Sequence, residues 1–158
     1  MEAVERQLVG GQGERGVVGV AHGGADVPGF QASFNINPVI AWSNGAGLTA
    51  IDRSKDLQIT WQGGAVDDRV LVMVYSASLD SSSNYAAGIA ACSQLASLGK
   101  LTIPASYLSL LPASNMMAGG GFLAFYSESL PARFQPSAGL DAGYIMTLGY
   151  SAAAVQVQ

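Results

Sequence analysis

Two runs decide the fold of this chain: Asp56-Leu-Gln-Ile-Thr-Trp-Gln-Gly-Gly64 and Arg69-Val-Leu-Val-Met-Val-Tyr-Ser-Ala-Ser78. Both are rich in apolar, β-branched and aromatic residues, and a short segment containing glycine and aspartate separates them. Such composition is typical of β-strands, and a short turn between two such runs is typical of neighbours in an antiparallel sheet. We therefore expect residues 57–61 and 70–76 to pair as central strands.

The remainder of the chain repeats this pattern and predicts an all-β fold. Residues 30–36 alternate apolar and polar side chains, as a strand with one buried face does. A single helical turn is expected over 105–111, because Pro104 and Pro112 bracket it. Gly88 favours a strand over a helix in the alanine-rich segment 85–92. The strand at 30–36 is expected to continue over 38–42 after a kink, and further strands are expected at 16–21, 48–51, 100–103, 121–126 and 143–157, the last bent at Gly149.

Eight or nine short strands at this spacing predict an antiparallel β-sandwich, Ig-like or jelly-roll-like, with a closed barrel as the alternative. The first fifteen residues carry several charges and glycines and are expected to form an arm or linker, or alternatively a strand followed by a loose turn. Residues 16–158 are expected to form one sandwich domain, a size that suits the length of the chain.

The composition excludes several classes of function. Only 11% of the 158 residues are charged and the net charge is −4, so a nucleic-acid partner is not expected. No window offers about 20 consecutive apolar residues, so no membrane-spanning segment is expected. The first nine residues lack a basic segment followed by an apolar one, so we do not expect them to act as a signal peptide.

A series of short motifs resembles a known type of module. In order, these are Gly23-Gly-Ala-Asp-Val-Pro-Gly-Phe30, Trp42-Ser-Asn44, Ile51-Asp-Arg-Ser54, Trp61-Gln-Gly-Gly64, Leu101-Thr-Ile-Pro-Ala105 and Gly139-Leu-Asp-Ala-Gly143. The series resembles a poorly characterised C-terminal β-sandwich module of large bacterial secreted or cell-surface proteins, over residues 16–158. The resemblance implies an extracellular, non-enzymatic role and supplies no catalytic residues. The polar loop 80–84 and the turn 116–121 depart from the pattern.

No pattern of residues indicates catalysis. His22 is the only histidine, and it lies in a glycine-rich segment of a chain that has no Gly-x-Ser-x-Gly motif, so a hydrolase triad is not expected. A zinc site needs several Cys or His ligands, and the chain has one of each. We expect His22 to be a solvent-facing turn residue. Cys92 is the only cysteine, and its alanine-rich surroundings indicate a small buried apolar side chain rather than a reactive thiol. We therefore expect no catalytic residues, no cofactor and no enzyme activity.

Ligand contacts are expected in the loops. Asp67 and Asp68 are adjacent, and Asp26, Asp52, Asp56, Asp80 and Asp141 all fall in expected turns. Loops at one end of a sandwich can bring such carboxylates together around calcium, although aspartate also favours turns without any metal. Most in-strand aromatic residues are expected in the core. Tyr85 and Tyr107, in or near loops, are the candidates for a sugar-stacking surface.

Three functions follow from these observations. We expect first an extracellular or cell-surface structural module that associates with copies of itself, through addition of segments 4–9 and 152–157 to open sheet edges. The alternative is a module that binds carbohydrate or another surface ligand, assisted by calcium, through Tyr85, Tyr107, Asp67 and Asp68. A hydrolase of secreted polymers is the third.

Overall fold

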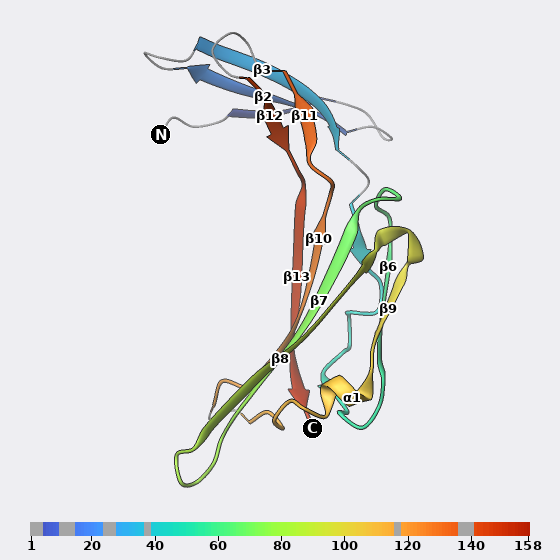
Figure 1. Cartoon of the computed structure of the whole chain (residues 1–158), viewed down its shortest axis with the longest axis vertical. Coiled ribbons are helices and arrows are strands. Elements are labelled where there is room, and N and C mark those ends of the chain that lie inside the picture. The colour runs from blue at the N-terminus through green and yellow to red at the C-terminus, as the bar shows by residue number, and fades with distance from the viewer. Residues whose placement is uncertain (1–4, 10–14, 24–27, 37–38, 116–117, 136–140) are drawn as a thin grey trace. The chain divides into compact units, whose positions relative to one another are not determined.

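The computed structural model describes residues 5–9, 15–23, 28–36, 39–115, 118–135 and 141–158. These residues are mostly β-strand, with a four-residue helix, α1 (Ala105–Leu108), and a 3-10 turn at Ala96–Leu98 (Figure 1). The predicted all-β class and the helical turn after Pro104 are confirmed. Within the described part of the chain, no helix is long and apolar enough to cross a membrane.

The chain divides into two compact units. One, here called the N-terminal unit, comprises Met1–Pro38 and Ser129–Thr147; the other, the sandwich unit, comprises Val39–Glu128 and Leu148–Gln158. This division differs from the predicted arm at 1–15 and single domain at 16–158. The sequence does not reveal this division, because residues 129–147 group with the first 38 residues, which are far away along the chain, and not with their sequence neighbours.

The N-terminal unit contains two small antiparallel sheets. Strands β1 (Glu5–Val9), β2 (Arg15–Gly23) and β3 (Pro28–Ile36) form one sheet in chain order, and β11 (Ala132–Phe134) pairs with β12 (Gly143–Ile145). The rings of Phe30 and Phe134 lie 5.9 Å apart. Residues 5–9 of the predicted arm form a strand paired with β2, and Arg15 begins β2 itself. Residues 1–4 and 10–14 of the arm, and residues 24–27 with Asp26, lie outside the described residues.

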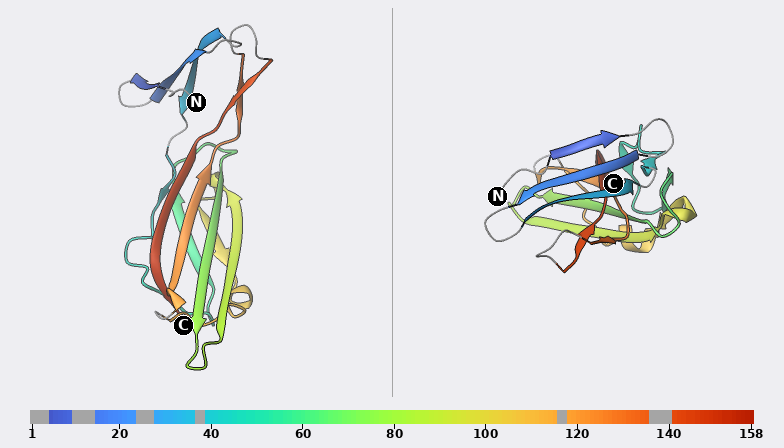
Figure 2. Two further views of the ribbon diagram at one scale, coloured as in Figure 1. Left: turned by 90° about the vertical axis from the view of Figure 1, so that its left-hand side faces the viewer. Right: turned by 90° about the horizontal axis from the view of Figure 1, so that it is seen from above.

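The sandwich unit consists of two sheets (Figure 2). The five-stranded sheet has the order β5 (Ala50–Ile51), β13 (Leu148–Val157), β10 (Gly121–Glu128), β7 (Arg69–Leu79) and β8 (Tyr85–Leu95). The three-stranded sheet has the order β4 (Ala41–Trp42), β6 (Leu57–Gln62) and β9 (Lys100–Ile103). All pairings are antiparallel except that of β13 with the short strand β5.

One apolar core lies between these two sheets. Ile59 and Trp61 of β6 face Val72 and Val74 of β7 in a single buried cluster, which also contains Phe125 of β10. Alternation along each strand sends every second side chain inward, which is why residues two apart share this core. The indole N–H of Trp61 donates to the carbonyl oxygen of Ala96 at 2.8 Å, so even the buried polar edge of the ring has a partner.

The predicted pairing of residues 57–61 with 70–76 is wrong. Strand β6 pairs with β4 and β9, whereas β7 pairs with β8 and β10 in the other sheet. The loop between β6 and β7 connects one sheet to the other. In this loop Gly63 and Gly64 adopt φ values of +90° and +84°, which other residues rarely adopt. Both strands bury alternate residues in the same core, and alternation alone does not reveal which sheet a strand joins.

The other strand predictions are largely confirmed. Residues 85–92 lie in β8, 100–103 form β9, and 48–51 contain the edge strand β5. The segment 143–157 is broken into β12 and β13 at Met146 and Thr147, just before the predicted bend at Gly149. The structure has more strand segments than predicted: β1 lies in the predicted arm, β11 lies outside the predicted strands, and the predicted strand 143–157 is divided into β12 and β13.

Candidate functional site

The outer face of the five-stranded sheet is apolar and aromatic. On β7 the residues facing away from the core are Leu71, Met73 and Tyr75, and their cross-strand partners on β10 are Tyr126, Ala124 and Phe122. Strands β13 and β8 extend these rows with Tyr150, Ala152, Ala154, Ile89, Ala91 and Ser93. We call this set, with Arg69 and Glu128 at one end, the outer face.

Large apolar side chains on the outer face remain in contact with solvent. Ile89 is 58% exposed, Tyr150 63%, and Phe122 38%. Neighbouring rings support one another: Tyr75 stacks on Phe122 at 5.0 Å between ring centroids, and Tyr126 lies 5.0 Å from Tyr150. Contiguous exposed apolar surface of this kind marks interaction sites in folded proteins.

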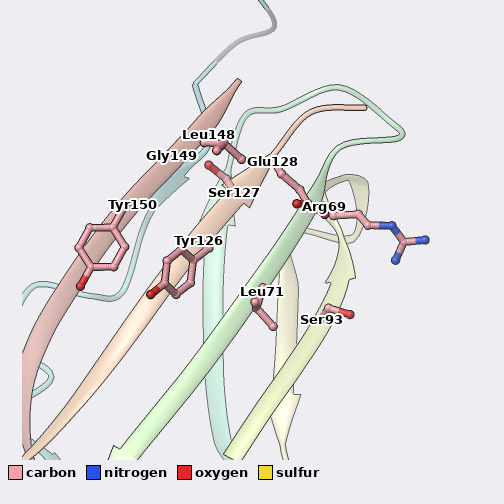
Figure 3. Close-up of a pocket in the computed structure, with 9 residues that line it drawn as sticks. All are labelled: Arg69, Leu71, Ser93, Tyr126, Ser127, Glu128, Leu148, Gly149 and Tyr150. Carbon is pink, nitrogen blue, oxygen red and sulfur yellow. The ribbon is translucent and has the colours of Figure 1, made fainter. Parts of the chain in front are cut away.

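A pocket of about 530 Å³ lies at the charged end of the outer face (Figure 3). The rings of Tyr126 and Tyr150 lie side by side on β10 and β13 (Figure 3). Arg69 and Glu128 line the pocket at the end of β7 and β10. Leu71, Ser93, Ser127, Leu148 and Gly149 complete its lining. Arg69 and Glu128 are cross-strand partners, yet the ion pair found within the described part of the chain is that of Lys55 with Asp52. The Arg69 guanidinium extends away from Glu128 into solvent (Figure 3).

Two edges of the five-stranded sheet have backbone groups directed outward. Flanking the β7–β8 hairpin, Asp80 N donates to the Asn84 carbonyl, and Ala96 N donates to that of Asp68. These two pairs continue the β7–β8 register at its two ends, and both join even-numbered residues. Hydrogen-bonded pairs recur at every second residue of an antiparallel ladder, so the even-numbered β8 residues exchange hydrogen bonds with β7. The backbone groups of the odd-numbered residues then point away from the sheet. These residues are Tyr85, Ala87, Ile89, Ala91 and Ser93.

Strand β13 also directs backbone groups away from the sheet. The amide of Ala77 donates to the Gly120 carbonyl, so odd residues of β7 bond to β10, and odd residues of β10 bond to β13. Even-numbered β13 residues therefore direct their backbone groups outward. Gln156 meets this expectation, since its amide donates to the Thr49 carbonyl beside β5. From Leu148 to Ala154, no described strand pairs with this edge.

Neither edge carries the features that usually prevent pairing. Strand β8 reads Tyr-Ala-Ala-Gly-Ile-Ala-Ala-Cys-Ser-Gln-Leu, and β13 reads Leu-Gly-Tyr-Ser-Ala-Ala-Ala-Val-Gln-Val, with no charged residue or proline in either. Soluble proteins commonly protect sheet edges with lysine, proline or a bulge, because an open edge is a template for another strand.

The two tyrosines predicted to contact ligand lie apart from one another. Tyr85 begins β8 and is 60% exposed, and its hydroxyl lies 2.8 Å from that of Tyr75. This hydrogen bond raises the pKa of Tyr75, with desolvation as a smaller cause. Tyr107 lies in α1 and is also exposed. Exposure of both is confirmed, whereas their role in binding stays a prediction.

The predicted carboxylates in the described part of the chain do not gather in one site, and several accept hydrogen bonds from backbone amides. Asp68 is buried, and its side chain accepts a hydrogen bond from the amide of Ala65 at 2.7 Å, while Asp67 beside it is exposed. Asp56 accepts from the amide of Ala105 at 2.8 Å.

Asp80 accepts hydrogen bonds from the side chain and amide of Asn84 and from the amide of Ser82, and these bonds lower its pKa. Among the described residues, no group of three or more His, Cys, Asp or Glu side chains is placed to hold a metal ion. Calcium stays a prediction without a site in this part of the chain.

His22 and Cys92 are the only histidine and the only cysteine of the chain. Strand β2 extends through His22 to Gly23, so His22 lies in a strand rather than in the predicted turn. Cys92 faces the core from β8, where it packs half-buried against the apolar cluster. Desolvation raises the pKa of its thiol, which agrees with the predicted apolar role and opposes nucleophilic reactivity.

The sequence reasoning missed the outer face because it assigned in-strand aromatic residues to the core. A signal was present in the near-continuous apolar run Val70-Leu-Val-Met-Val-Tyr75. A strand with one face in solvent alternates apolar and polar residues, whereas a strand that is apolar on both faces is typically covered on both sides. Comparison with protein-family models, with curated proteins and with solved structures finds no match for this chain.

Proposed function

We propose that this chain is a non-enzymatic structural subunit of an extracellular or cell-surface assembly, in which copies associate by strand addition at sheet edges. The extracellular setting rests on the resemblance of the sequence to secreted β-sandwich modules. Self-association rests on one structural observation: the five-stranded sheet has two open, uncharged edges whose backbone groups point outward.

The two edges are complementary in direction. Strand β8 runs antiparallel to β7, β7 to β10, and β10 to β13, so β8 and β13 run in opposite directions. Placing β8 of one copy beside β13 of the next therefore extends the sheet with antiparallel pairing, the pattern of its other long strands. A contact between two different surfaces does not close on itself and generates a linear polymer unless its rotation completes a ring.

The outward groups are also matched in spacing, because every second residue of each strand contributes them. Five β8 residues, from Tyr85 to Ser93, and four β13 residues, from Leu148 to Ala154, direct their backbone N–H and C=O groups to their open edges. A ladder between them would satisfy groups that otherwise bond to water. The short strand β5 covers β13 only at Gln156 and Val157, beyond the segment that the ladder uses.

The test exploits the free amide of Ala91. Ala91→Pro removes an N–H that points off the edge, and Ala91→Ser keeps that N–H with little change in size. Sedimentation velocity over a range of concentrations should show growing oligomers for the wild-type chain and for Ala91→Ser, and arrested growth for Ala91→Pro. Equal growth of all three chains would contradict strand addition at β8.

A second candidate function is supported by the pocket at Tyr126 and Tyr150. Tyr150 is exposed and the adjacent Tyr126 is half-buried. Such a pair of rings next to charged groups is suited to stacking on a sugar ring and hydrogen-bonding its hydroxyls. In this proposal Tyr126 and Tyr150 replace Tyr85 and Tyr107 as the stacking residues. Loss of binding on a glycan array for Tyr150→Ala, with retention for Tyr107→Ala, supports it; equal binding by both variants contradicts it.

A further inference from the structure

We propose that the outer face of the five-stranded sheet binds the same face of a second copy, forming a symmetric dimer held by apolar contacts and by Arg69–Glu128 pairs between copies. This inference deepens the proposed self-association, but it concerns the face of the sheet rather than its edges. The face and the edges can therefore fail independently.

The composition of β7 indicates that its outer side is covered. Leu71, Met73 and Tyr75 alternate with Val70, Val72 and Val74, so the strand is apolar on both faces. The inner valines are fully buried in the core. On the outer side Leu71 is exposed and Met73 and Tyr75 are half-buried. A second layer over the outer face would bury them, as sheets do when they pack about 10 Å apart.

The face is large enough for a specific contact. Strands β13, β10, β7 and β8 share a register over about eight residues, from Arg69 to Ser76 on β7. With about 3.3 Å per residue and about 4.8 Å between strands, this region measures about 26 by 19 Å, or about 500 Å². Two copies would bury about 1,000 Å² in total, which is the lower limit for a stable protein–protein interface.

Charge complementarity selects the arrangement of the two copies. Arg69 and Glu128 are the only charged residues on the described outer face, and they sit side by side at one end of β7 and β10. Consider a two-fold axis that lies above the outer face, parallel to the strands and midway between β7 and β10. It places each β7 residue opposite the β10 residue of the second copy at the same height. Arg69 then faces Glu128 of the second copy, and Glu128 faces its Arg69.

The same axis matches the sizes of the apolar side chains. Met73 lies opposite Ala124 of the second copy, and Tyr75 lies opposite its Phe122. A large residue over a small one and a ring over a ring are the contacts that let two sheets interdigitate. An axis perpendicular to the strands would instead place the charged end against the apolar end, leaving Arg69 and Glu128 without opposite charges.

The decisive experiment uses two variants that are each defective alone. Arg69→Glu places two carboxylates opposite each other across the dimer, and Glu128→Arg places two guanidinium groups opposite each other. Mixing the two variants restores opposite charges across the interface, while each chain keeps like charges within itself. Both variants are made in the Ala87→Pro chain, so that edge contacts do not contribute; Ala87 pairs with Ala77, beyond the Arg69–Ser76 register that the face contact uses.

Association is measured by sedimentation equilibrium, with melting temperature as a check that each variant is folded. We expect the edge-blocked parent to dimerise, each charge variant to have a dimer Kd raised on the order of tenfold, and their equimolar mixture to recover the parental Kd. The inference is overturned if the edge-blocked parent is monomeric, if either charge variant dimerises as the parent does, or if the mixture shows no recovery.

Failure of the edge proposal has a different signature. Ala87→Pro would then grow to the same oligomers as the wild-type chain, whatever the charges at 69 and 128. A parent that stops at the dimer supports both the blocked edge and the face contact.

Discussion

A pair of adjacent alanines offers the sharpest stability test of the hydrogen-bond pattern on β8. Ala90 faces the core and belongs to an even-numbered pair with Val74, so its amide bonds within the sheet. Ala91 is exposed, and its amide points off the edge. The two positions therefore receive the same substitution, to proline, with opposite consequences for the isolated subunit.

The expected magnitudes follow from the groups that each change affects. At Ala90, proline removes a ladder hydrogen bond and leaves the Val74 carbonyl without its partner, which costs about 1–3 kcal/mol. The proline ring also replaces a side chain that is only 8% exposed, and a packed site resists such added volume at about 1–3 kcal/mol. At Ala91 no sheet hydrogen bond is lost, so we expect a change within about 1 kcal/mol.

Urea denaturation of the monomeric fraction measures both changes. A difference of about 2 kcal/mol or more between the variants corresponds to about 1 M in the urea midpoint for a small domain. Ala90→Ser and Ala91→Ser serve as controls that keep both amides. Equal destabilisation by proline at the two positions, or a greater loss at Ala91, would refute the assignment of odd-numbered residues to the open edge and with it the basis for strand addition.

Three further predictions concern other parts of the sandwich unit. Tyr85→Phe removes the hydroxyl that raises the pKa of Tyr75, so tyrosinate absorbance should report a lower pKa for Tyr75. Because a raised pKa favours the neutral phenol in the folded state, the stability from this pair is present below the ordinary tyrosine pKa and is lost as pH rises through the raised one. Hydrogen bonds from Asn84 and Ser82 lower the pKa of Asp80, so its contribution is present above the ordinary carboxyl pKa and is lost as pH falls through the lowered one. The stability difference between the wild-type chain and Asp80→Asn should shrink in acid, and a difference independent of pH would contradict this account. Phe125, 2% exposed and stacked on Trp42 at 5.8 Å, should lose about 3–5 kcal/mol of unfolding free energy on Phe125→Ala, whereas Phe122→Ala on the outer face should lose far less in the monomer.

Much of the fold could be predicted from the sequence because strand propensity and alternation are local properties. The segments 85–92, 100–103 and 121–126 all lie in strands, and a short helix follows Pro104 as expected, over Ala105–Leu108 of the predicted 105–111. Pairing could not be predicted in the same way. Strands β6 and β7 send side chains into one core from opposite sheets, and nothing in either run encodes which neighbour supplies its hydrogen bonds.

The candidate site was predicted less well than the fold. Turn aspartates such as Asp80 and Asp68 accept hydrogen bonds from amides two to four residues away, and this local use occupies the groups that a metal site would need. The outer face depends on which of two alternating sets meets the second sheet. For β7 both sets are apolar, so Leu71 and Met73 could be assigned to the surface only after the position of β6 and β9 was known.

The helical rise of the assembled protein tests the proposed strand addition most directly. Four strands per copy, β13, β10, β7 and β8, at about 4.8 Å each give a rise of about 19 Å per subunit along a continuous sheet. Helical reconstruction from electron micrographs of concentrated protein should give this value, with β8 of one copy against β13 of the next. A chain that stays monomeric at every concentration, or a polymer joined through other segments, would contradict it.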